Sequence, residues 1–176
     1  IEEVFTNHDY EPYAIKRDEE VKKILGEHGI KFSTYKDQVI FEKDEVVKPD
    51  GKPYTIYTPY SNTWRKKFDK NDIRAYTIKD QFKNFYKFKS KIISLDEIGF
   101  KKTDLNFPSK DIRKDIIKNY ENTRDTPSIE GTSRLSVHLR FGTVSPRMLV
   151  KEALKLNDVW LRELIWREFF MMILYH

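Results

Sequence analysis

Three hydroxyl side chains follow a glycine in the second half of the chain and have the types and spacing to bind an anion. They belong to Thr132, Ser133 and Ser136, directly after Gly131 and at the start of a predicted helix. The unpaired N–H groups and the positive pole of a helix start attract phosphate, and neighbouring hydroxyls add donors. The ordinary alternative is a helix cap that holds no ligand.

A second group lies on one face of a helix predicted near the end of the sequence. At about 100° per residue, two indoles, a carboxylate, a guanidinium and a phenyl ring fall within roughly a third of its circumference: Trp160, Glu163, Trp166, Arg167 and Phe170. Opposite charges between indoles are costly to bury unless the face lines a polar cavity or the charges pair. The spacing therefore leaves two interpretations, a wall for a planar ligand or a buried Glu163–Arg167 pair.

Several other classes of chemistry find no support in the sequence. The four histidines have no HxxxH or HExxH spacing and cysteine is absent, so no metal site, disulfide or thiolate nucleophile is expected. The absence of cysteine fits a cytoplasmic protein. No run of 18 apolar residues predicts a membrane span, and no basic segment followed by an apolar stretch predicts a secretory signal. The first residue is Ile1, which suggests that the chain starts partway into a larger protein.

The charge is concentrated in the middle of the chain. Of the formal net charge of +5, residues 62–118 alone carry +8, against −4 for residues 1–61 and +1 for residues 119–176. Within this block Lys alternates with Phe and Tyr, a mixture that can follow a phosphate backbone and stack on bases. The alternative is a surface linker with solvated lysines and aromatics packed on neighbouring domains, and we favour it because charge runs are usually solvated.

The first 60 residues have an α/β pattern. A strand near residues 4–10, an amphipathic helix over 16–29 and a strand at 30–32 suggest the last part of a parallel sheet. A third strand is expected at residues 37–41. A hairpin is expected at residues 45–57, with its arms joined by a Pro-Asp-Gly turn. So small a sheet cannot bury both faces, which predicts further strands or a covering partner.

Strand signals fade after residue 60. A short helix is expected from Ser61, then a connector to Pro108, where no clean period is found. Helices follow at 111–121, after Ser145-Pro146 and over 158–175. The expected fold class is therefore α/β followed by all-α, with domains at residues 1–60 and 109–176 and a connector at 61–108.

The motifs EGTSRLSVHLRFGTVSPR and WLRELIWREFF closely resemble the DNA photolyase/cryptochrome family, and most of all its bacterial class I cyclobutane pyrimidine dimer photolyases. YEPYAIKRDEEV and DGKPYTIYTPYSNTW resemble the end of its α/β antenna domain. The resemblance covers essentially the whole chain. It implies the end of a Rossmann-like antenna domain, a long connector and the first helices of a helical FAD-binding domain.

The resemblance also implies roles for individual residues. Those matching cofactor-binding positions are Tyr120, Thr132, Ser133, Leu135, Ser136, Trp160, Glu163 and Arg167. Glu163 further matches the carboxylate that faces the damaged bases, and Trp166 the indole that stacks on the flipped-out dimer. Arg124 matches a contact to DNA phosphate. Tyr13 and Ala14 stand where folate-binding members have Asn-Glu, which argues against a folate antenna and leaves the second chromophore open.

The activity implied by the resemblance is light-driven DNA repair, in which reduced FAD donates an electron to a cyclobutane pyrimidine dimer flipped out of the duplex. The implied partner is UV-damaged DNA, with no metal and no membrane, and the full-length protein is expected to be a monomer. The 176-residue chain alone is expected to be inactive and to bind FAD weakly or not at all.

Two alternatives remain at this point. A cryptochrome photoreceptor has the same scaffold without repair, but the presence of both Glu163 and Trp166 favours cyclobutane-dimer repair. The second alternative is a flavin-free nucleic-acid-binding module built on the basic block.

Overall fold

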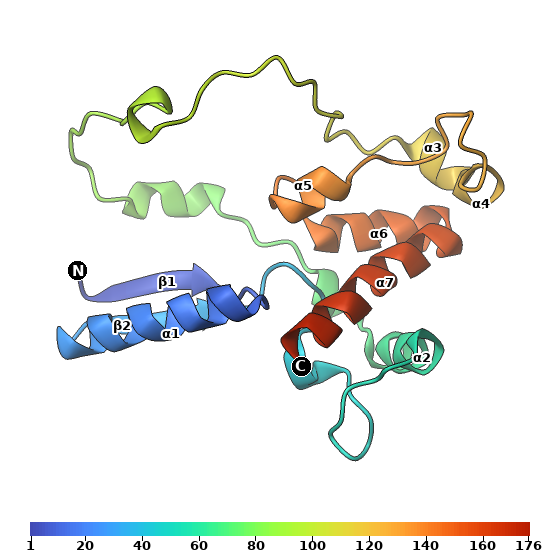
Figure 1. The fold of residues 1–176 in the computed structure, drawn as a ribbon, viewed down its shortest axis with the longest axis horizontal. Coiled ribbons are helices and arrows are strands. Elements are labelled where there is room, and N and C mark those ends of the chain that lie inside the picture. Colours follow the sequence, from blue (N-terminus) through green and yellow to red (C-terminus); the bar gives the residue numbers. More distant parts are fainter.

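The computed structural model describes residues 1–176, and Figure 1 shows a strand–helix–strand unit beside a body of helices. In chain order the strands and α-helices are β1 (Glu3–Asn7), α1 (Pro12–Glu27), β2 (Lys31–Tyr35), α2 (Tyr57–Lys67), α3 (Lys114–Lys118), α4 (Tyr120–Thr123), α5 (Ser136–Arg140), α6 (Pro146–Leu156) and α7 (Asp158–Tyr175). Four 3₁₀ helices, η1 to η4, span Lys43–Glu45, Lys70–Ile73, Lys79–Asn84 and Asp96–Ile98. The expected order, α/β and then helices, is confirmed.

The strand–helix–strand unit forms as predicted. β1 pairs in parallel with β2, with Glu3 opposite Lys31 and Asn7 opposite Tyr35. α1 begins earlier than predicted, at Pro12, because proline fits the first helical turn, where no N–H donor is needed. Ala14 is the only buried residue of α1, so the two-stranded sheet and its helix leave much apolar surface exposed.

The strand predicted at residues 37–41 is wrong. Ile40 and Phe41 are buried in the core of the helical body, and their N–H groups donate to the Glu168 carboxylate of α7 rather than to a neighbouring strand. The backbone N–H groups of this apolar segment therefore bind a side-chain carboxylate, where the prediction had them pair with a neighbouring strand. Local sequence could not reveal an acceptor so distant in the chain.

The hairpin predicted at residues 45–57 is also wrong, although its turn exists. The Gly51 N–H donates to the Lys48 carbonyl at 2.9 Å, and the Lys48 N–H donates to the Lys52 carbonyl at 2.9 Å. Beyond that turn the two arms form no ladder. The second arm instead enters α2, which begins at Tyr57 rather than at Ser61, with Pro59 tolerated in its first turn.

α7 is the central helix of the body. It packs against both α6 and α2 (Figure 1), and its partners come from both halves of the sequence. Ile40 to Trp64 supply five members of the 17-residue core, and the others come from Ile117 onward. The packing thus crosses the domain boundary predicted at residue 60, and that boundary stays a prediction. None of the helices combines the length and the apolar character that crossing a bilayer would require.

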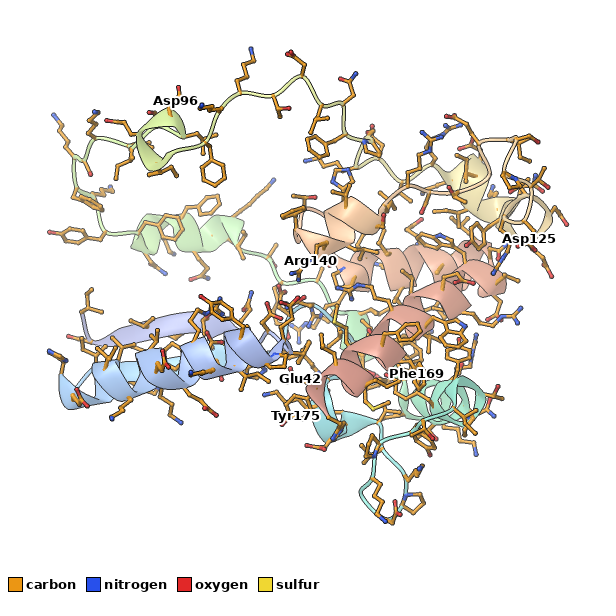
Figure 2. The ribbon with its side chains drawn as sticks, viewed as in Figure 1. Glu42, Asp96, Asp125, Arg140, Phe169 and Tyr175 are labelled. Atoms are coloured by element: carbon orange, nitrogen blue, oxygen red, sulfur yellow. The ribbon has the colours of Figure 1, made fainter.

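Polar contacts join the strand–helix–strand unit to the helical body. Glu42, just before η1, accepts from the Tyr10 hydroxyl at 2.8 Å and lies 2.8 Å from His8 Nδ1. Arg140 of α5 pairs with Glu11 at 2.9 Å, and Figure 2 shows Arg140 between the two parts.

Most of the connector predicted at residues 61–108 lies in an extended loop over residues 69–111, which carries η2, η3 and η4 and which we call the connector from here on. Figure 2 shows Asp96 of this loop far from α7, and from Arg74 to Lys110 every residue is exposed. Both ends of the connector join the helical body, since Phe68 and Ile112 pack against its core.

Candidate functional site

A cavity of about 170 Å³ lies between the segment that precedes α5 and one face of α7. All eight residues expected to bind the cofactor line it: Tyr120, Thr132, Ser133, Leu135, Ser136, Trp160, Glu163 and Arg167. Leu139 and Leu164 complete the lining. Residues separated by up to 47 positions along the chain thus converge on one space.

The hydroxyl side of the cavity is held by close contacts between Gly131 and Thr123 of α4. Gly131 lies so close to α4 that a Cβ on it would be 2.6 Å from the Thr123 carbonyl oxygen. Thr123 Oγ1 in turn donates to the Gly131 carbonyl at 3.2 Å. Arg134 has a φ of 51°, a left-handed conformation that non-glycine residues rarely adopt and that is concentrated at functional sites. These contacts fix the path of residues 131–136 around the cavity.

The hydroxyls of Thr132, Ser133 and Ser136 form no hydrogen bond within the chain, so all three remain available to a ligand. The helix that these residues lead into, α5, has only five residues. A helix of that length contributes little dipole, and therefore anion binding here would depend mainly on the hydroxyls.

α7 supplies the opposite wall of the cavity. Its start is capped by Asn157, whose side chain accepts from the Trp160 N–H at 3.0 Å. Trp160 is buried, while Glu163 follows one turn later at the cavity edge. The ring and the carboxylate are therefore placed by a rigid helix rather than by a loop.

Glu163 forms an ion pair with Arg124, from the residues just after α4. The Arg124 guanidinium also lies over the Tyr120 ring, 5.4 Å from its centroid. The hydrogen bond to Glu163 raises the pKa of Arg124 further above its ordinary value. Burial, followed by the charge of Glu163, raises the pKa of the Tyr120 hydroxyl. The candidate DNA contact and the candidate base contact are thus one charged pair.

Arg167 does not pair with Glu163, so the alternative of a buried Glu163–Arg167 pair is wrong. Arg167 Nη1 donates to the Gln38 carbonyl at 2.6 Å, which ties α7 to the segment after β2. Burial lowers the pKa of this guanidinium, with the neighbouring Glu168 acting in the opposite direction. The Arg167 side chain also lines the cavity.

Trp166 does not line the cavity. Its ring is stacked on Tyr57 of α2 at 3.7 Å between centroids, with an angle of 7° between the planes. Phe170 stacks on it at 5.5 Å, and Phe169, labelled in Figure 2, meets it edge-on. A base can therefore stack on this indole only on surface that Tyr57, Phe169 and Phe170 leave free.

Glu168 is a residue that the sequence analysis did not single out. It is 3% exposed and accepts from the N–H groups of Ile40 and Phe41 and, at 2.6 Å, from Trp64 Nε1. Burial raises its pKa to about 7 in spite of these donors. The available signal was its place in a helix that is apolar around most of its circumference, where a buried carboxylate needs hydrogen-bond donors.

The residues present fit part of a flavin dinucleotide. Free hydroxyls and a guanidinium suit its phosphates, and the Trp160 ring and leucines suit a planar group. The volume of about 170 Å³ is below the roughly 300–1,000 Å³ of sites that enclose whole ligands. The chain therefore offers one wall for such a group. No cluster of three or more His, Asp or Glu side chains is arranged to hold a metal ion.

Comparison with known proteins finds relatives of a single kind. The family model for DNA photolyase matches residues 1–79. The deoxyribodipyrimidine photo-lyase of Alkalihalophilus pseudofirmus is 30% identical over 197 residues, covering 98% of this chain and 40% of the relative. The enzyme of the same name from Escherichia coli is 29% identical and covers 98% of this chain and 40% of the relative.

Two solved structures share the fold. A bacterial class III photolyase from Agrobacterium tumefaciens matches with a TM-score of 0.73 and 23% identity, over 99% of this chain and 41% of that one. An archaeal photolyase from Sulfolobus tokodaii, solved with two FAD molecules, matches with a TM-score of 0.62 and 23% identity, over 99% and 39%.

The proteins that this chain is similar to over almost its whole length are DNA photolyases. The chain spans about 40% of the length of the relatives it matches.

Proposed function

We propose that the protein containing these residues is a light-dependent DNA-repair lyase of the class I type that uses FAD to split cyclobutane pyrimidine dimers. The observation that carries this proposal is the convergence of all eight candidate cofactor residues on one cavity. Relatives named deoxyribodipyrimidine photo-lyase over almost the entire chain support it.

The cofactor would be held from two sides. Thr132, Ser133 and Ser136 would donate to its phosphates, and Trp160 would cover part of a ring. When bound and reduced, FAD supplies, on absorbing blue or near-ultraviolet light, the electron that opens the cyclobutane ring and then takes that electron back. Buried Leu135 excludes water from the floor of the site.

Glu163 would bind the damaged bases. Its carboxylate lies at the cavity edge and accepts hydrogen bonds, so it can receive the N–H groups of two pyrimidines. Its partner Arg124 brings a positive charge to the same edge. That charge would stabilise the negative charge that develops on the bases, which is stabilisation specific to the reacting state.

Arg124 and Trp166 would hold the DNA around the lesion. Arg124, about one-third exposed, can reach a backbone phosphate while it contacts Glu163. The Trp166 indole would stack on a flipped base on the surface that Tyr57, Phe169 and Phe170 leave free. Flipping a dimer out of the duplex is favoured because a lesion that pairs badly costs less to extrude.

The test measures dimer loss by the full-length protein. UV-irradiated duplex DNA is incubated with the reduced, FAD-loaded protein in blue light and in darkness, and dimers are counted by a dimer-specific nuclease. We expect loss of dimers in light only. Absence of light-dependent loss with FAD bound would overturn repair in favour of a photoreceptor. DNA binding indifferent to damage and to FAD would favour the flavin-free module instead.

A further inference from the structure

A second cavity lies outside the site described above, between η2 and α6. It measures about 620 Å³. It shares no residue with the cavity lined by the eight candidate cofactor residues, which we call the cofactor cavity from here on after its proposed ligand. Four cationic side chains, one amide and three apolar side chains form its lining: Lys70, Arg74, Lys151, Lys155, Asn71, Ile73, Ala75 and Leu154. We call this space the basic groove.

The charges of the basic groove are largely unbalanced. Its lining holds no carboxylate. Lys155 pairs with Glu152 at 3.2 Å, but the same carboxylate also holds Lys114 at 3.1 Å. Lys70, Arg74 and Lys151 form no ion pair. An anion in the groove would therefore meet three cations without internal partners.

The arrangement of these cations has a cost that an anion would relieve. Lys151 and Lys155 are four residues apart on α6, a spacing at which like charges destabilise a helix. η2 adds Lys70 from the opposite side of the groove, and Arg74 directly follows η2. The fold thus gathers positive charge from two segments that are about 80 positions apart in sequence.

The basic groove also has an apolar part, which a site that binds phosphate alone would not need. Ile73 packs against the core, and Leu154 is 47% exposed at the groove surface. A flat ring can lie on these side chains while phosphates meet the lysines. The volume of about 620 Å³ is within the range of roughly 300–1,000 Å³ usual for small-molecule sites.

We propose that the basic groove binds a nucleoside polyphosphate, with its phosphates on Lys70, Arg74 and Lys151 and its ring against Ile73 and Leu154. Duplex DNA fits less well, because a phosphodiester backbone would not use the apolar part of the groove. This binding is independent of the proposed repair activity.

The test is titration calorimetry of the full-length protein with ATP, adenosine and pyrophosphate at low salt. We expect ATP to bind most tightly, pyrophosphate more weakly and adenosine not measurably. The double variant Lys70→Gln/Lys151→Gln should lose at least tenfold in ATP affinity. The matched variant Lys101→Gln/Lys102→Gln removes the same charge from the exposed connector and should stay within twofold. Circular dichroism of each variant confirms that the fold is retained.

A third variant separates the two cavities. Thr132→Ala/Ser133→Ala alters the hydroxyl side of the cofactor cavity and should leave ATP affinity unchanged. Loss of ATP binding in this variant would place ATP in the cofactor cavity and overturn the proposal. Equal ATP affinity of the wild type and Lys70→Gln/Lys151→Gln would also overturn it, as would displacement of ATP by equimolar undamaged duplex DNA.

Discussion

Glu163 forms an ion pair with Arg124, and the contribution of its negative charge to repair can be tested by substitution. In the full-length protein, Glu163→Gln keeps the size of the side chain but removes the charge and one acceptor position. We expect the yield of dimer repair per absorbed photon to fall by roughly 10- to 150-fold, because losing a charge-assisted hydrogen bond costs on the order of 1.5–3 kcal/mol. FAD content is measured by absorbance, so that the repair yield is compared per bound FAD.

Glu121→Gln is the matched control, since Glu121 is an exposed acid in the neighbouring α4 and does not line the cavity. It should leave the repair yield at the wild-type value. An unchanged yield in Glu163→Gln would overturn the proposed role of Glu163 in binding the damaged bases.

Glu168 makes the stability of the chain depend on pH. Its pKa is about 7 in the folded chain and near the ordinary 4.5 when unfolded, because burial disfavours the charged form. The folded state therefore holds the extra proton, and the free energy of unfolding falls as pH rises from about 4.5 to about 7. The loss is up to about 3 kcal/mol, at 1.36 kcal/mol per pKa unit.

Urea denaturation at pH 5 and pH 7.5 measures this effect. Glu168→Gln should abolish most of the decrease, whatever its stability at a single pH. Glu152→Gln, which alters a partly exposed acid whose pKa Lys114 lowers, should retain the decrease. Parallel pH curves for the wild type and Glu168→Gln would contradict the assignment of the decrease to this carboxylate.

The residues lining the cofactor cavity could be predicted from the sequence to an unusual extent, while their contacts could not. The helical period placed Trp160, Glu163 and Arg167 on one face, and all three line the cavity. The partner of Glu163 was missed because Arg124 is 39 positions away and reaches it only through tertiary packing. The helical period places Trp166 on the same face, but its indole packs against Tyr57 of α2 and does not line the cavity.

At the scale of elements, the close approach of Gly131 to α4 fixes one side of the cofactor cavity. Gly131→Ala would place a Cβ 2.6–2.8 Å from Thr123 atoms, two of which belong to a packed side chain. We expect a loss of about 1–3 kcal/mol in the free energy of unfolding, as for other overpacked sites, measured by urea denaturation. FAD binding by the full-length protein should weaken as well.

Gly26→Ala provides the matched control. Gly26 is within α1, and nothing lies within 4 Å of the place that a Cβ on it would take. Alanine there should stabilise the chain by roughly 0.5–1 kcal/mol, because it is the better helix former. A neutral Gly131→Ala would show that α4 can move away from residue 131 without cost.

Elements with strong local signals were predictable, and those completed by distant partners were not. Ser145 before Pro146 predicted the start of α6, and the Ser145 hydroxyl accepts from the Met148 N–H. By contrast, the apolar run at residues 39–41 resembles a strand but is buried beneath α7, with its donors bound to Glu168. The apolar pattern of these residues reflects burial against a helix, which does not require a β-sheet.

At the scale of the whole molecule, the connector is the segment most open to proteolysis. It is exposed and rich in lysine, whereas both of its ends are packed on the helical body. We expect limited trypsin to cut first between Lys79 and Lys102. The two products should elute together in gel filtration, because Tyr60 and Trp64 of one product share a core with Ile165 and Phe169 of the other.

Gel filtration in denaturant provides the reference, since there the two products must separate. Separation without denaturant would show that the connector holds the body together covalently. First cleavage within α6 or α7 would contradict the assignment of the connector as the most accessible segment.

Because both ends of the connector pack on the same helical body, the fold does not require a particular number of residues between them. The free energy of closing such a loop changes slowly with the number of residues, by about 0.6 kcal/mol for each doubling. A small reporter domain inserted within residues 85–95 should therefore leave the helical body folded. Related proteins should likewise tolerate insertions and deletions in this segment.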